Sequence, residues 1–272
     1  MSHKSAEPSR DNTERHVRPT VRVISVDLSR LDLNETMEQL CVWIDRAEKK
    51  RICVTPVNCL LEAQKDKNLR KIYNSSDMNL ADGVPTVWAS RFLGHPIHGR
   101  VTGLDLLPAF AEIAAQRKYS FFFLGAKEGV ASTLASVLTA RHPALKIAGV
   151  YSPPFAENFS EEENAAIARM INAVKPDVLW VSLTAPKQDF WIYNNFHRLD
   201  VKVALGVGGA FEVTAGIIAR APGWMQNCGL EWFFRFLQEP RRLFRRYFIE
   251  APVFIPLVML QKMGLLKDER GV

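Results

Sequence analysis

The sequence is poor in cysteine, and its cysteines form no recognisable metal or redox pair. The chain of 272 residues has four, with no Cys-x-x-Cys spacing. They are Cys41, Cys53, Cys59 and Cys228. We therefore expect reduced thiols in a cytoplasmic protein, and neither a disulfide framework nor a zinc site. His95 and His98 lack the acidic partner of a zinc-binding helix, and Pro96 between them indicates a loop.

Long apolar runs are also missing. The nearest to a membrane span, Ala251 to Leu260, is about half the roughly 18 to 20 residues that a spanning helix needs, and two prolines interrupt it. It cannot cross a membrane, although it could lie on one. Residues 1–20 are polar and lack the apolar core of a signal peptide, so we expect a disordered leader there.

Several motifs of well-known enzyme classes are absent. There is no Gly-x-Ser-x-Gly elbow, no P-loop, and no Asp-x-Asp pair to hold a divalent ion on a nucleotide diphosphate. The glycines from Gly206 to Gly209 lack the dinucleotide fingerprint spacing, which disfavours a nicotinamide cofactor. We expect no cofactor and no metal. If a diphosphate leaves during a reaction, fixed cations or helix N-termini must neutralise it.

What the sequence does contain is a folded α/β pattern. Its apolar content is 47% and its net charge is +6, and we expect no nucleic-acid partner. Apolar runs predict strands over residues 21–26, 51–57, 119–124, 145–150, 177–183 and 201–207. Helical spacing predicts helices over residues 34–49, 60–73, 85–93, 104–117, 127–141, 160–174 and 187–198. This alternation predicts a doubly wound, Rossmann-like parallel sheet flanked by helices, over residues 21–218.

Residues 219–272 differ in composition and predict a basic, aromatic helical appendage. Two apolar stripes occupy residues 229–248, and Pro240 should break that run into two helices. Arginines crowd the same region, which points to an anionic surface or ligand. They are Arg220, Arg235, Arg241, Arg242, Arg245 and Arg246. The pattern fits a membrane-surface element with its aromatics turned inward, and equally a packed helix pair with a solvated arginine face.

Polar and glycine-rich loops follow four of the predicted strands. They are residues 55–58, 125–129, 184–188 and 206–212. Ligands bind at the carboxyl ends of strands in open α/β sheets, so these loops describe a nucleotide or sugar-phosphate pocket. Gly125 and Gly129 could seat a phosphate or could be turn residues. Lys187 and Gln188 could face the pocket or form a solvated first turn.

Asp82 is the candidate reactive group. It stands between a predicted helical run and a helix that starts near Pro85, and Gly83 beside it allows a ligand to approach closely. A general base at this place would take a proton from a substrate hydroxyl. The alternative is that the carboxylate only caps the following helix.

Taken together, a series of motifs resembles the WecG/TagA/CpsF family of glycosyltransferases, which build bacterial surface polysaccharides. The similarity runs from about Val21 to Phe248. In chain order the motifs are Thr55-Pro56 with Asn58, Ala81-Asp82-Gly83, Arg100-Val101-Thr102-Gly103-Leu104-Asp105, Phe123-Leu124-Gly125, Pro186-Lys187-Gln188-Asp189, Arg220-Ala221-Pro222, Glu231-Trp232 and Glu239-Pro240-Arg241. Glu212 and the loop of residues 182–185 depart from the family pattern, which bears on the donor sugar.

The resemblance implies an inverting, metal-independent transfer of a hexosamine or hexose from a UDP-sugar to a polyprenyl-diphosphate-linked sugar. It implies Asp82 as the base, with Thr55 as a further catalytic residue. The expected substrate-binding residues are Asn58, Gly83, Arg100, Gly103, Gly125, Lys187, Gln188, Gly208, Gly209 and Glu212. The expected contacts to the lipid diphosphate and the membrane are Arg220, Arg235, Arg241, Arg242, Arg245 and Arg246.

The resemblance also places the protein at the inner face of the bacterial cell membrane, on an anionic surface, and allows a homo-oligomer. Two rival functions remain open. A non-enzymatic membrane-binding adaptor would use the same arginine-rich and aromatic segment, but would bind no nucleotide sugar. A nucleotide-dependent oxidoreductase would carry a bound nicotinamide or flavin.

Overall fold

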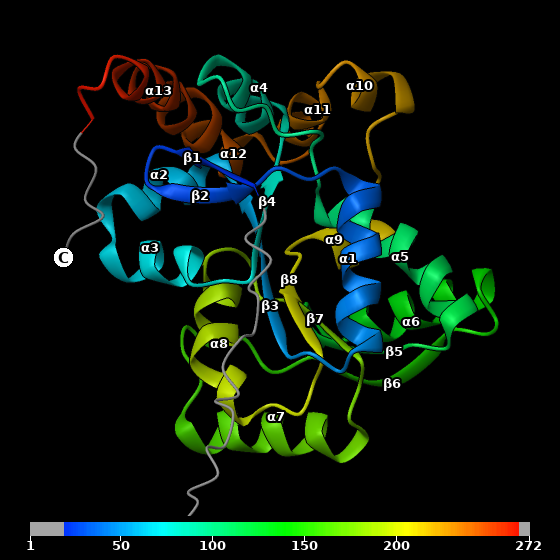
Figure 1. The fold of residues 1–272 in the computed structure, drawn as a ribbon. Helices are drawn as coiled ribbons and strands as arrows, with labels where there is room; N and C mark the ends of the chain where they lie inside the picture. Colours follow the sequence, from blue (N-terminus) through cyan, green and yellow to red (C-terminus); the bar gives the residue numbers. More distant parts are fainter. Residues whose placement is uncertain (1–18, 267–272) are drawn as a thin grey trace, which may run out of the picture.

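A six-stranded sheet with all its strands parallel organises the protein (Figure 1). The structure is a computed structural model that describes residues 19–266. The strand order is β4-β3-β8-β7-β5-β6. The strands are β3 (Lys50–Pro56), β4 (Met78–Asp82), β5 (Ser120–Gly125), β6 (Lys146–Tyr151), β7 (Val178–Ser182) and β8 (Val203–Gly206). The predicted doubly wound sheet is confirmed.

Helices cover both faces of the sheet because its central strands are apolar on both sides. Phe121 and Phe123 of β5 enter one core, whereas Phe122 and Leu124 enter the other. The first face carries α1 (Leu33–Asp45), α5 (Gly103–Arg117), α6 (Val130–Arg141) and α9 (Ala210–Thr214). The second face carries α2 (Val57–Lys65), α3 (Lys67–Asn74), α7 (Glu161–Val174) and α8 (Lys187–Asn195), which a short 3-10 helix, Phe196–Arg198, extends.

The first predicted strand, residues 21–26, was wrong in extent, because a turn divides it after Val23. The chain instead forms a separate antiparallel hairpin of β1 (Thr20–Val23) and β2 (Val26–Ser29). Ile24 takes a φ of 59° at the turn. Glycine, asparagine and aspartate are the residues that usually adopt this conformation. The turn was missed because Ile24 and Ser25 carry no such signal.

The predicted helix 60–73 was also wrong in extent, because it is two helices. The chain is extended at Asp66, whose side chain accepts hydrogen bonds from the backbone N–H groups of Asn68 and Leu69. This N-cap starts α3 and ends the continuous run.

Strand β4 was not predicted, and it changes the position of Asp82. Asp82 is the last residue of a buried strand rather than a residue between two helices. Gly83, with a φ of 114°, then serves as the N-cap of α4 (Val84–Phe92). The carboxyl end of β4 therefore presents Asp82 at the same edge as the other strand ends.

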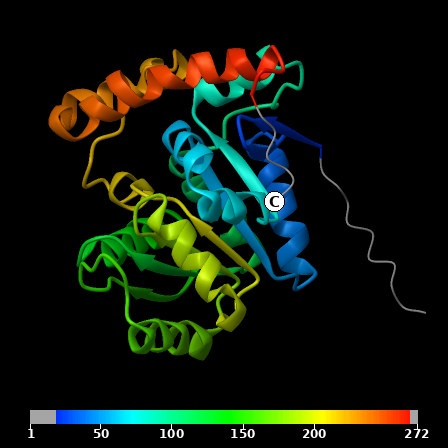
Figure 2. The same ribbon diagram turned by 90° about the vertical axis from the view of Figure 1, so that its left-hand side faces the viewer.

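The C-terminal helices extend along one end of the molecule (Figure 2). They are α10 (Gly223–Asn227), α11 (Glu231–Gln238), α12 (Pro240–Phe244), a π-helical stretch (Arg245–Glu250), a 3-10 turn (Ala251–Val253) and α13 (Phe254–Lys262). The break at Pro240 is confirmed. None of the helices within residues 19–266 has the length and apolar character that crossing a bilayer requires.

The aromatic side chains of this C-terminal region were expected to turn inward, and most do not. Leu243 is buried, whereas Trp232, Phe233, Phe244 and Phe248 are exposed. The division at residue 219 stays a prediction, and the expected leader falls largely outside the described residues.

Candidate active site

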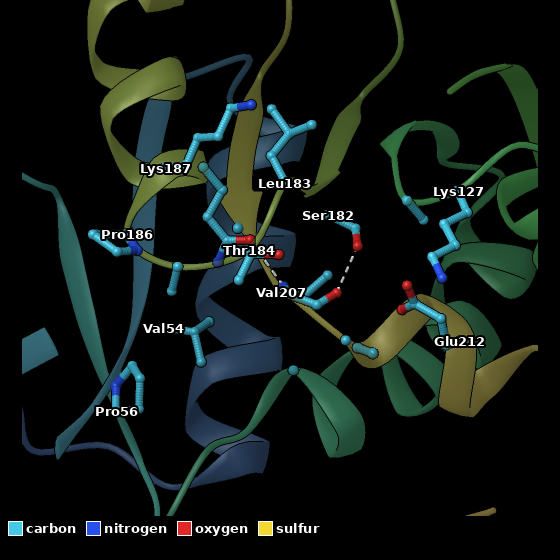
Figure 3. A pocket seen from close by; sticks show the side chains of 18 of the residues that line it. Val54, Pro56, Lys127, Ser182, Leu183, Thr184, Pro186, Lys187, Val207 and Glu212 are labelled. Atoms are coloured by element: carbon cyan, nitrogen blue, oxygen red, sulfur yellow. Dashed lines mark hydrogen bonds between the residues drawn. The ribbon is translucent and has the colours of Figure 1, made fainter. Parts of the chain in front are cut away.

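A cavity of about 1040 Å³ opens over the carboxyl ends of the parallel strands (Figure 3). Figure 3 shows Val54 and Pro56 at the end of β3, Lys187 at the start of α8, and Lys127 and Glu212 on the opposite side. Residues from the C-terminal helices complete the wall. The strand-end pocket predicted from four loops is therefore present, and two further strand ends, those of β4 and β6, contribute to it.

The predicted site residues fall into two groups. Those that line the cavity are Asp82, Gly103, Lys187, Gln188, Gly208, Gly209, Glu212, Arg235, Arg242 and Arg246. Those that lie elsewhere in the described structure are Thr55, Asn58, Gly83, Arg100, Gly125, Arg220, Arg241 and Arg245. The roles assigned to both groups stay predictions.

Asp82 reaches the cavity from the end of β4 and does not cap α4, because Gly83 holds the N-cap position without a side-chain hydrogen bond. The alternative that Asp82 is only a helix cap is therefore wrong. Burial raises the pKa of Asp82 to about 6, and the guanidinium groups of Arg246, Arg235 and Arg100 limit that rise. A carboxyl group with this pKa can accept a proton near neutral pH and is still ionised there.

The arginine-rich segment divides into residues that face the cavity and residues that do not. Arg235 of α11, Arg242 of α12 and Arg246 line the cavity. Arg241 and Arg245 are exposed outside it, and Arg245 pairs with Glu250 at 3.0 Å. The C-terminal helices thus add positive charge to the lining of the cavity.

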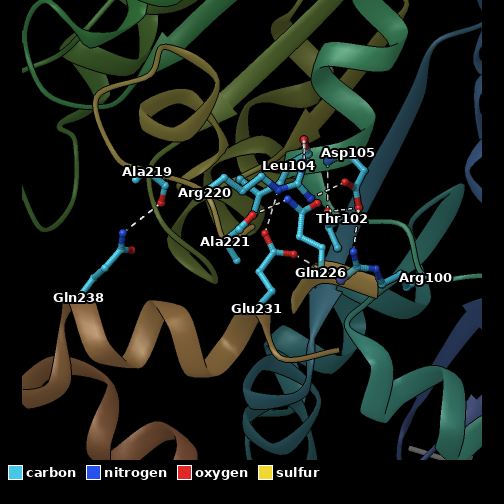
Figure 4. Close-up of polar contacts among 10 residues, drawn as sticks. All are labelled: Arg100, Thr102, Leu104, Asp105, Ala219, Arg220, Ala221, Gln226, Glu231 and Gln238. Carbon is cyan, nitrogen blue, oxygen red and sulfur yellow. Dashed lines mark hydrogen bonds and ion pairs between the residues drawn. The ribbon is translucent and has the colours of Figure 1, made fainter. Parts of the chain in front are cut away.

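Arg100 and Arg220 belong to an ion-pair network beside the cavity (Figure 4). Glu231 accepts from Arg220 Nε at 2.9 Å and from Arg100 Nη1 at 3.4 Å. Asp105 pairs with Arg220 and lies 3.7 Å from Arg100 Nη2. Because Glu231 is the first residue of α11, the network fixes that helix against the start of α5 and so positions Arg235 one turn later.

The glycines near the cavity permit close packing of neighbouring loops. Gln188 is buried and accepts a hydrogen bond from the N–H of Gly208 at 3.0 Å. A Cβ on Gly206 would lie 2.6 Å from the Gln188 side chain, and one on Gly103 would lie 2.8 Å from Cβ of Val207. A Cβ on Gly125 would overlap the carbonyl group of Ser182. These glycines are required by packing whatever the ligand.

Thr55 and Asn58 lie behind the cavity wall. Thr55 is fully buried, and its Oγ1 has no hydrogen-bond partner among the described residues. Oδ1 of Asn58 is likewise buried and without a partner in that part of the chain. A direct contact with a ligand would require the end of β3 and the start of α2 to rearrange.

The sequence patterns did not predict one part of the cavity lining. The loop between β6 and α7 contributes residues 152–156 and Phe159. Lys187 donates a hydrogen bond to the carbonyl of Ala156, and its Nζ lies 4.8 Å from the centre of the Phe159 ring. The loop contains prolines and aromatics but no glycine, so it lacked the signal that identified the other strand-end loops.

Asp189, which follows Gln188 in the sequence, points away from the cavity into the core. Asp189 is 1% exposed and its Oδ2 accepts a hydrogen bond from the hydroxyl of Tyr73 at 3.2 Å. Burial raises its pKa from 3.8 to about 7. This contact ties the first turn of α8, which presents Lys187 and Gln188, to α3.

Replacing Tyr73 with phenylalanine is expected to lower the free energy of unfolding by about 1–3 kcal/mol, because Asp189 then loses its buried donor. Between pH 4 and 7 the folded protein binds more protons at Asp189 than the unfolded chain, so stability should fall as pH rises. Urea unfolding at several pH values measures both effects. Asp189→Asn should flatten this dependence. Tyr193→Phe is the control, since its ring rather than its hydroxyl contacts Arg51, at 4.6 Å.

Comparison with known proteins finds a matching family and several named relatives. The model of the glycosyl transferase WecG/TagA/CpsF family matches residues 21–268. A protein of Bacillus subtilis (strain 168), named N-acetylglucosaminyldiphosphoundecaprenol N-acetyl-beta-D-mannosaminyltransferase, is 33% identical over 180 residues, which are 66% of this chain and 68% of the relative. A protein of the same name from Staphylococcus aureus (strain MRSA252) is 26% identical over 256 residues, 93% of this chain and 98% of the relative.

Proposed function

Because this chain belongs to the WecG/TagA/CpsF family of glycosyltransferases, we propose that it moves a sugar from a UDP-sugar to a polyprenyl-diphosphate-linked sugar. The reaction inverts the anomeric carbon, needs no metal, and uses Asp82 as the general base. One observation carries the assignment of the base. The half-buried carboxylate of Asp82 enters a large strand-end cavity that guanidinium groups also line.

The proposed chemistry is a single displacement. Asp82 accepts the proton of the acceptor hydroxyl as its oxygen bonds to the anomeric carbon, and the bond from that carbon to the UDP oxygen breaks. Negative charge grows on the leaving diphosphate. Arg235 and Arg246, which line the cavity and lie close enough to Asp82 to lower its pKa, are the proposed counter-charges.

The names of the relatives favour a hexosamine as the transferred sugar and an N-acetylglucosaminyl-diphosphoundecaprenol as the acceptor. On this chain, Lys187, Gln188 and Glu212 line the part of the cavity formed by the ends of β7 and β8. Oε2 of Glu212 is buried and has no hydrogen-bond partner among the described residues. It is therefore available to accept a hydrogen bond from the donor.

The acceptor is a membrane lipid, so we propose that the protein docks on the inner face of the cell membrane. The exposed aromatics of α11 and α12 and the exposed Arg241 and Arg245 support contact with an anionic surface. The same apolar exposure would also support a homo-oligomer.

The first test is thermal unfolding of the full chain with a panel of nucleotides and nucleotide sugars in the presence of EDTA. UDP or a UDP-N-acetylhexosamine is expected to raise the midpoint, since a ligand at 100 times its Kd stabilises the folded state by about 2.7 kcal/mol. NAD is the control and should have no effect. Vesicle binding without any nucleotide-sugar response would instead favour the adaptor, and a response to NAD alone the oxidoreductase. Transfer to a polyprenyl-diphosphate N-acetylglucosamine then tests the reaction itself.

A further inference from the structure

Exposed apolar side chains are concentrated at one end of the molecule. Within the described residues, most of the large ones belong to α4 or to the chain from Trp224 onward. The exceptions are Val42, Val150, Phe155, Met170, Val174 and Ile217. Every exposed tryptophan of the described residues is in the concentrated group: Trp88, Trp224 and Trp232. The group therefore includes a helix of the sheet domain as well as the C-terminal helices.

Helix α4 directs an apolar face outward. Val84, Trp88 and Phe92 recur at intervals of four residues and are all exposed, whereas Thr86, Val87, Ala89 and Ser90 are buried. The rings of Trp88 and Phe92 stack with centroids 6.0 Å apart. An exposed apolar stripe on a helix whose other face is already packed is typical of an interaction surface.

The outer face of α4 is continuous with the C-terminal helices at both of its ends. At its start, a Cβ on Gly229 would lie 3.3 Å from Cγ2 of Val84. At its end, Nζ of Lys262 lies 6.0 Å from the centre of the Phe92 ring. Figures 1 and 2 both show α4 and α13 side by side at this end of the molecule.

Helix α13 is held firmly against the sheet domain, so the two helices form one surface. Phe254 and Val258 pack into the core that also contains Val87 of α4. The side chain of Gln261 accepts a hydrogen bond from the N–H of Ile24 and donates one to the carbonyl of Arg22. Ile255 and Met259 of α13 stay exposed.

Helices α4 and α13 carry basic but no acidic side chains. Residues 84–100 and residues 251–266 contain no aspartate or glutamate. Arg91 and Lys262 are exposed there at the end of α4 and the end of α13. An exposed tryptophan flanked by basic residues is typical of a protein surface that rests on anionic lipid headgroups.

We propose that α4 and α13 together form a membrane-contact surface, so that the sheet domain itself rests on an anionic bilayer. This deepens the proposed function and rests on its membrane acceptor. Asp82 and Gly83 lead directly into α4. Seating α4 at the headgroup level therefore brings Asp82 close to the depth at which a lipid-linked diphosphate lies.

The test compares Trp88→Glu with the wild-type full chain in sedimentation with vesicles of phosphatidylglycerol and phosphatidylcholine. Trp88 lies outside the cavity and is 53% exposed, so the variant should fold. We expect its affinity for the anionic vesicles to fall about tenfold or more, since a carboxylate replaces an interfacial aromatic. Transfer to a short-chain, water-soluble lipid-diphosphate acceptor should stay at the wild-type rate. Met170→Glu, on the exposed face of α7, is the matched control and should bind vesicles normally.

Three other results would overturn the inference. If Trp88→Glu binds vesicles as the wild type does, α4 does not touch the bilayer, and the transferase assignment is unaffected. If the wild type transfers sugar but binds no vesicles, the membrane surface fails while the reaction stands. If Trp88→Glu only converts an oligomer to a monomer in light scattering, the surface is an interface between two copies of the chain.

Discussion

Replacing Asp82 with asparagine is expected to reduce kcat by about 10²- to 10⁴-fold, the usual contribution of a positioned general base. Asparagine is nearly the same size but cannot accept the proton of the acceptor hydroxyl. The affinity for UDP should change little, because the proposed donor contacts come from Lys187, Gln188 and Glu212. A radiolabelled sugar transfer assay and UDP titration measure the two quantities separately.

The thermal stability of Asp82→Asn is the control measurement for this prediction. Burial raises the pKa of Asp82 to about 6, so above that pH the ionised carboxylate is less favourable in the folded state than in the unfolded chain. The asparagine variant should therefore unfold at the same temperature as the wild type at pH 8, or at a higher one. Turnover like that of the wild type in a correctly folded variant would exclude Asp82 as the base. A large loss of stability would mean that Asp82 has a structural role.

The central strands could be predicted because each is a continuous apolar run, which a sheet covered on both faces requires. Strand β4 could not, since its five residues include Asn79, a polar residue that is nevertheless buried. The Asn79 side-chain amide donates to the carbonyls of Asp27 and Tyr73, both at 2.8 Å. Those partners come from β2 and α3, so only the tertiary fold explains why asparagine is accepted in the strand.

The parts of the site in which glycine or a charged residue follows a strand could be predicted. The parts in which tertiary packing decides whether a side chain faces the cavity could not. The strand-end loops with Gln188 and Gly208 do line the cavity. Arg220 carries the same charge as its neighbours, yet it pairs with Asp105 and Glu231 instead of lining the cavity. Sequence alone has no means of separating a guanidinium that is already paired from one that faces a ligand.

Replacing Arg246 with alanine is expected to have a large effect, because this residue is proposed both to bind the diphosphate and to lower the pKa of Asp82. Arg246 lines the cavity and is the arginine that most lowers the pKa of Asp82. Loss of charged hydrogen bonds to the diphosphate, each contributing about 1.5–3 kcal/mol, should reduce kcat/KM by about 10- to 100-fold. The pKa of Asp82 should also rise above about 6, because its main positive neighbour is gone.

The pH dependence distinguishes these two effects. The base must be ionised to act, so kcat/KM of the wild type should rise with pH and level off above about pH 6. In Arg246→Ala the rise should occur at a higher pH and to a lower plateau. Arg245→Ala is the matched control, because Arg245 is the next residue but lies outside the cavity and pairs with Glu250. With a short-chain, water-soluble acceptor, which removes any effect of membrane docking, Arg245→Ala should leave both the plateau and the position of the rise unchanged. If the plateau falls in Arg246→Ala but kcat/KM rises at the same pH as in the wild type, Arg246 does not affect the pKa of the base. The base would then have to be a group other than Asp82.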